Sequence, residues 1–140
     1  MTIAKPMRVP GDPAKDAKNA LRQFLTGQCD VNIVRPNSRG VPDGWTINDG
    51  PTAIVADDGG PNMWPVATRP QIRFTVWAKG RTEARRLAGL ALGYLYSARI
   101  PGLGYVDPNS GTALIDDYDT ELGAAFASFT VGVVSRTRPA

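Results

Sequence analysis

Residues 70–98 read PQIRFTVWAKGRTEARRLAGLALGYLYSA. The first half alternates, with apolar side chains at every second position and mostly polar ones between them, which is the period of a strand with one buried face. Gly80 interrupts this pattern, and the residues after it have helical spacing. We therefore expect a strand over residues 71–79, a corner at Gly80 and a helix over residues 82–99.

The helix expected over residues 82–99 is apolar on more than one side. Its main stripe consists of Ala84, Leu87, Ala88, Ala91, Leu95 and Ala98. Leu90, Leu92, Tyr94 and Tyr96 lie off that stripe, and a helix that is apolar nearly all round is buried on more than one side. One side can face the sheet, so we expect a second subunit to cover Leu90 and Tyr94. The alternative is packing on its own sheet alone, with the tyrosines at the rim.

The rest of the chain predicts the element order α-β-β-β-α-β-β. Asp12 is a helix N-cap candidate with Pro13 at the first helical position, and the apolar spacing continues to Leu25. Further strands are expected over residues 29–35, 52–57, 112–118 and 124–136. This order predicts an α+β fold, with an antiparallel or mixed sheet of about five strands and both helices packed on one face.

Prolines and glycines mark the boundaries of this domain. Residues 1–11 are expected to form a flexible N-terminal arm, residues 12–136 one domain and residues 137–140 a frayed tail. Residues 36–51 are rich in proline and glycine and predict a long loop, a kind of segment that often carries function.

Composition narrows the functional classes. The 140 residues carry a net charge of +3, contain no His and have one Cys, which removes the commonest general base and excludes an internal disulfide. We predict that the chain is not an enzyme and uses no cofactor or metal. No apolar run approaches the ~20 residues that cross a bilayer, so we also expect no membrane partner.

Two charged clusters leave alternatives open. Arg81, Arg85 and Arg86 oppose the dipole at a helix start, so they are either a solvated face or interface residues. As interface residues they would pair with a neighbour's acidic strand, including Asp117 and Asp119, or line a route for nucleic acid. The acidic segment is alternatively a Mg²⁺ site, although adjacent strand residues point to opposite faces.

Tryptophans supply further candidates for an interface. Trp77 lies on the polar side of its strand and Trp64 in a loop beside Met63, and exposed aromatic residues are frequent interface anchors. Packing within the chain is the alternative for both. Trp45 either holds the 36–51 loop down or belongs to a short strand.

Residues 70–88, PQIRFTVWAKGRTEARRLA, resemble the tail terminator (tail completion) proteins of long-tailed bacteriophages, as does the CDVNI segment at residues 29–33 after an N-terminal helix. The resemblance implies a virion structural protein that is assembled in the bacterial cytoplasm and located at the tail–neck junction. Such a protein forms a hexameric ring that caps the tail tube and joins it to the head connector, and DNA passes through the lumen without sequence-specific binding.

The resemblance also implies roles for particular residues. The second helix and its neighbouring strand would form the subunit interface, while Trp45, Met63 and Trp64 in loops would contact the tail tube or connector. Alternatives are another head–tail neck or minor tail protein, a basic nucleic-acid-binding module, and a Mg²⁺-dependent enzyme that uses residues 116–121.

Overall fold

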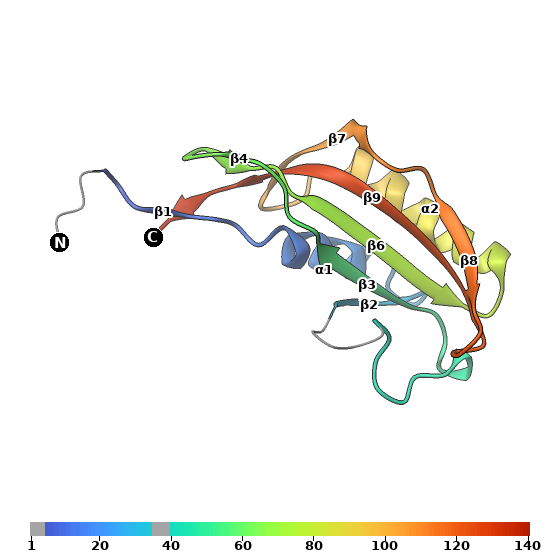
Figure 1. Ribbon diagram of the computed structural model, residues 1–140. Coiled ribbons are helices and arrows are strands. Elements are labelled where there is room, and N and C mark those ends of the chain that lie inside the picture. Colours follow the sequence, from blue (N-terminus) through green and yellow to red (C-terminus); the bar gives the residue numbers. More distant parts are fainter. Residues whose placement is uncertain (1–4, 35–39) are drawn as a thin grey trace.

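The computed structural model describes residues 5–34 and 40–140 (Figure 1). It has an α+β fold with two helices and a mixed sheet. In chain order, the elements are β1 (Arg8–Val9), α1 (Pro13–Phe24), β2 (Asp30–Ile33), the short 3₁₀ helix η1 (Ile47–Asp49), β3 (Thr52–Asp57), β4 (Asn62–Met63), β5 (Ala67–Thr68), β6 (Gln71–Ala78), α2 (Arg81–Ser97), β7 (Leu103–Gly111), β8 (Ile115–Asp119), β9 (Ala124–Arg136) and β10 (Arg138–Pro139).

β9 organises the larger sheet. On one side it pairs antiparallel with β6 and, near its end, with β5; on its other side it pairs with β7 and β8. β6 continues to β3, which pairs parallel with β2, so the sheet is mixed. β4 and β5 form a hairpin that extends the sheet beyond α1, while β1 and β10 form a separate two-stranded sheet (Figure 1).

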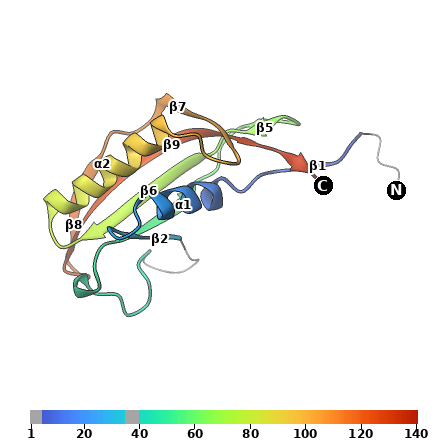
Figure 2. The ribbon, with the colours of Figure 1, turned by 180° about the vertical axis from the view of Figure 1, so that it is seen from behind.

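Both helices pack on the same face of the large sheet (Figure 2). The side chain of Asp12 accepts a hydrogen bond from the Lys15 N–H at 3.1 Å, and Pro13 is the first residue of α1, as the sequence predicts. Leu21 and Leu25 are fully buried against the sheet. This is the expected behaviour of an amphipathic helix with an apolar stripe.

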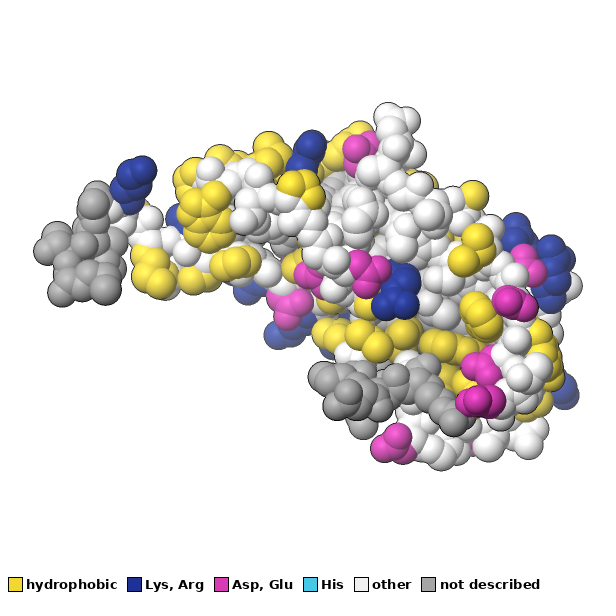
Figure 3. Space-filling view, viewed as in Figure 1, with side chains coloured by type: hydrophobic (Ala, Val, Ile, Leu, Met, Phe, Trp, Pro, Cys, Tyr) yellow, Lys and Arg dark blue, Asp and Glu magenta, His cyan; other side chains and the backbone are white. Residues whose placement is uncertain are grey.

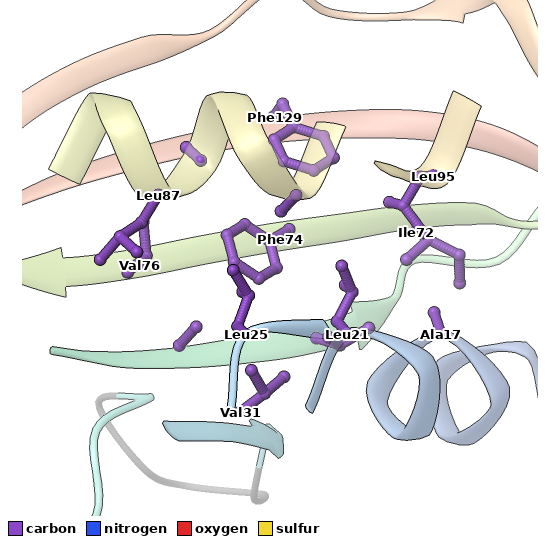
Figure 4. Close-up of a cluster of buried hydrophobic side chains, with 14 of the residues drawn as sticks. Ala17, Leu21, Leu25, Val31, Ile72, Phe74, Val76, Leu87, Leu95 and Phe129 are labelled. Carbon is purple, nitrogen blue, oxygen red and sulfur yellow. The ribbon is translucent and has the colours of Figure 1, made fainter. Parts of the chain in front are cut away.

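The core lies between the helices and strands β3, β6 and β9. Phe74 of β6 and Phe129 of β9 stack with ring centroids 5.3 Å apart, and Leu87 and Leu95 of α2 cover the same layer (Figure 4). The small residues of α2, Ala84, Ala88 and Ala91, are all completely buried. α2 can therefore lie close to the aromatic layer.

The predicted strand count and element order were incomplete. The structure adds β1, β4, β5, β7 and β10. β7 lies between the helix expected to residue 99 and the strand expected from residue 112, and it pairs with β9 through two irregularities of register. Such irregular pairing weakens the alternating pattern by which strands are recognised.

The two chain ends also differ from expectation. Residues 1–4 lie outside the described residues, but Arg8–Val9 and Arg138–Pro139 pair with each other instead of lacking regular structure. Neither segment has enough residues to show a period, so only their meeting in space defines the two strands. In β2, Val31 is buried, whereas Ile33 is exposed.

Candidate interaction surfaces

The arginines at the start of α2 pair with acidic residues of the same chain. Arg81 Nε lies 2.7 Å from Asp116 Oδ2, and Arg85 Nη1 lies 2.8 Å from Asp116 Oδ1. Hydrogen bonds from Arg85 and then from Arg81 lower the pKa of Asp116. These contacts join the first turn of α2 to β8 and offset the unfavourable position of the cations at a helix start.

Arg86 is engaged in the same way. Its guanidinium contacts Glu83 at 2.8 Å and donates to the Gln28 side chain at 3.0 Å. The hydrogen bond from Arg86 lowers the pKa of Glu83. The three arginines therefore have partners within their own chain. Their pairing with a neighbouring subunit stays a prediction.

Asp117 and Asp119 face away from this ion-pair group. Asp117 Oδ1 accepts the Tyr118 N–H at 2.7 Å, and Asp119 Oδ1 accepts the N–H groups of Glu121 and Leu122 at 3.0 and 3.1 Å. Asp119 therefore stabilises the turn that leads into β9. Asp117 is exposed and available to a partner.

The outer side of α2 is less apolar than the sequence predicted. Tyr94 stacks on Phe24 of α1 with ring centroids 4.2 Å apart, so its ring is packed within the chain, and Leu92 contacts the core. Leu90 and Tyr96 remain exposed, at 36% and 39%. The helix therefore leaves two separate apolar side chains exposed rather than a second buried face.

Trp77 requires a correction. The side chain is only 6% exposed and lies in a second apolar cluster with Ile54 and Ala124, on the sheet face opposite the helices. Partly buried residues of the 40–51 loop, including Trp45, pack against this cluster, and Trp45 Nε1 donates to the Gly50 carbonyl at 3.0 Å. Trp77 is thus a packing residue and not an exposed anchor, and Trp45 holds the loop down.

Beside this second cluster, the helix-free face is hollowed. A depression of about 480 Å³ is lined by residues of β6, β8 and β9, among them Thr75, Ile115, Asp119 and Phe126. Thr75 and Ser128 are hydrogen-bonded to each other at 3.0 Å at its floor. Ile115, exposed on the edge strand β8, gives the depression one apolar side chain at its rim, and Arg73 and Asp119 also line it.

Met63 and Trp64 lie at the end of the β4–β5 hairpin and are exposed, at 46% and 50%, as is the neighbouring Val66. The sequence identified the apolar residues of this segment but not their setting. The missed residue is Thr137, whose hydroxyl donates to the Pro65 carbonyl and accepts from Arg8 Nε at 3.2 Å. No sequence signal marks Thr137, because its partners are more than 70 residues away.

Residues 5–34 and 40–140 contain no group of three His, Cys, Asp or Glu side chains that could hold a metal ion. Burial raises the pKa of the Cys29 thiol to about 12, which keeps it protonated. In the same described ranges, no helix is long and apolar enough to span a bilayer.

No family model matches the chain, and no curated protein matches it either.

Proposed function

We propose that this protein is a tail terminator of a long-tailed bacteriophage, a structural protein whose copies form a ring on the tail tube and join it to the head connector. Its location would be the tail–neck junction of the virion. Catalysis has no part in the proposal, since the mechanism is steric capping by an assembled ring. The sequence resemblance at residues 70–88 motivates the family, and the α+β fold is compatible with it.

The observation that carries the proposal is the distribution of exposed apolar side chains. Three of them, Met63, Trp64 and Val66, gather on a projecting hairpin, and Ile115 and Tyr118 lie on opposite faces of the edge strand β8. Exposed apolar groups in such clusters mark interaction sites. Edge strands are also a common place for chains to meet, because their backbone groups lack partners on one side.

A chain with two separate contact surfaces can use one on each neighbour. Such heterologous contacts generate a ring when the rotation between copies closes. A six-membered ring is the form proposed here. Its lumen would pass DNA without reading its sequence.

The test is the position of the chain in virions. Antibody and gold labelling of long-tailed particles that carry this protein should place the label at the head–tail junction. Label along the tail or at its tip would contradict the proposal and favour another minor tail protein. Removal of the gene should give tails of uncontrolled length, whereas tails of normal length would count against a terminator.

One observation favours a second candidate, a basic nucleic-acid-binding module. The segments 5–10, 61–69 and 136–140 carry Lys5, Arg8, Arg69, Arg136 and Arg138 and no acidic residue. A phosphate-binding surface would give affinity for duplex DNA that falls steeply with salt. Binding by the isolated subunit at about 0.15 M salt would favour this candidate over the terminator.

A further inference from the structure

Three segments form one projecting unit, which we call the arm: residues 5–10, residues 61–69 with the β4–β5 hairpin, and residues 136–140. β1 pairs with β10 through Arg8↔Pro139 and Val9↔Arg138, and β5 pairs with the end of β9 through Ala67↔Arg136. The arm extends from the end of the sheet beyond α1 (Figures 1 and 2).

Thr137 joins the three segments. Its N–H and hydroxyl both contact the Val66 carbonyl, at 3.2 Å each, and Arg8 Nη2 donates to the Thr137 carbonyl at 2.8 Å. Thr137 is buried, and the Ala140 N–H adds a bond to the Met7 carbonyl at 3.1 Å. The arm is thus built by specific hydrogen bonds, which favours a defined shape over a loose tail.

The surface of the arm is apolar and basic. Met7, Met63, Trp64 and Val66 are 46–70% exposed. The arm also has five cations and no carboxylate side chain, and the described residues give none of these cations an ion pair within 4.0 Å. Arg138 lies near Asp16 of α1. Burial raises the pKa of Asp16, and the positive charge of Arg138 offsets part of that rise.

The other end of the molecule carries four aspartates without an ion pair to any described residue. Asp117 and Asp119 lie on β8, and Asp43 and Asp49 lie on the loop beneath it; acidic side chains are visible at this end in Figure 3, away from the apolar group on the arm. Of the cations at this end, Arg81 and Arg85 are engaged by Asp116, and Lys79 is exposed at the end of β6.

One chain cannot bring these two surfaces together. The hairpin pairs with β9 at Ser135 and Arg136, whereas β8 pairs with β9 at Ala124 to Ser128. At about 3.3 Å per residue, the intervening strand separates the pairing sites by roughly 23–40 Å. The arm also points away from β8 (Figure 1).

We propose that the arm of one copy docks on the helix-free face of the next copy, with Trp64 and Val66 against the rim of the depression at Ile115 and the basic segments facing Asp117. A second copy is the partner because the two surfaces are complementary in charge and apolar character and lie at opposite ends of one chain. The contact is head-to-tail, so it propagates from copy to copy and closes into a ring. This inference rests on the proposed ring and specifies which surfaces form it.

The test uses two full-length variants, Val66→Asp on the arm and Asp117→Arg on the acidic face. Val66 is 70% exposed and Asp117 is exposed, so both chains should keep the wild-type circular dichroism and melting temperature. Sedimentation should give an assembly for the wild type and, for each variant alone, association weakened at least about tenfold, as for an interface hot spot. Lys15→Glu, an exposed charge reversal on α1, is the matched control and should assemble as the wild type does.

Mixing the two variants gives the decisive result. A Val66→Asp chain retains an intact acidic face and an Asp117→Arg chain an intact arm, so the mixture should form a one-to-one complex and nothing larger. A wild-type monomer at all concentrations, variants that assemble normally, or a mixture that stays monomeric would each overturn the inference. So would an arm variant that loses salt-dependent DNA binding while its assembly is unchanged.

This experiment is independent of the location in the virion. Assembly that depends on both surfaces, together with gold label away from the neck, would keep the docking mode and reject the terminator function. Gold label at the neck, together with assembly that neither substitution weakens, would keep the terminator function and reject the docking mode.

Discussion

Replacing Thr137 by Val should detach the arm without unfolding the body of the protein. Valine keeps the shape but removes the hydroxyl that donates to the Pro65 carbonyl and accepts from Arg8 Nε. Thr137 is only 5% exposed, so water cannot fully replace these bonds. Two bonds at about 1 kcal/mol each, less what the loosened arm recovers from water, give a local loss of about 1–2 kcal/mol.

Native-state hydrogen exchange measures this loss directly. The amide of residue 137 bonds to the Val66 carbonyl, so its exchange reports opening of the arm. A loss of about 1–2 kcal/mol corresponds to exchange about 5–30 times faster, with amides of β6 unaffected because the body opens separately.

Thr112→Val is the matched control. Thr112 Oγ1 accepts the Thr130 N–H at 3.1 Å at an exposed site on β9, away from the arm. Exchange at residue 137 should stay at the wild-type rate in this variant. The reasoning would be refuted if Thr137→Val left that amide unchanged or if protection fell equally in the arm and in β6.

Three further outcomes are expected. Phe74→Ala removes a fully buried ring that stacks on Phe129 and should lower the free energy of unfolding in urea by about 3–5 kcal/mol; a loss below about 1 kcal/mol would contradict this packing. Asp116→Asn should lower the free energy of unfolding at neutral pH. Because the arginines lower the folded-state pKa of Asp116, the difference in stability from the wild type should vanish as the pH falls through that pKa. A difference in stability that does not change with pH would show that the ion pairs are not its cause. Cys29 is half-buried, and its pKa is raised to about 12, so it should react with iodoacetamide at pH 8 about a thousandfold more slowly than a free thiol. A rate within tenfold of the free thiol would contradict this burial.

The longer elements could be predicted because their patterns are local. β3 and β9 have the predicted bounds, and α2 begins one residue before the predicted start and ends two residues before the predicted end. The capping aspartate and following proline of α1 act within a few residues of each other. Such signals need no knowledge of the rest of the fold.

The arm could not be predicted because the contacts that form it join residues far apart in the sequence. β1 and β10 have two residues each, and they exist because the chain ends meet. β7 was missed because Pro108 and two glycines within the strand signal turns, whereas its partner β9 imposes an extended path with bulges.

The exposure of the candidate interface residues could be predicted only in part, because exposure depends on what else covers a residue. Trp77 has a polar setting in the sequence but is buried beneath a loop, and Tyr94 is covered by Phe24. Trp64 and Met63 are exposed because the hairpin carries them beyond the body. Periodicity identifies the face of an element but not the loop that covers it.

Electron microscopy of the purified protein tests most directly whether its copies form a ring. We predict closed particles with a central hole and, for six copies of the 15.0 kDa chain, a mass of about 90 kDa in solution. Particles without a hole, or a species of 15.0 kDa at every concentration, would contradict the ring.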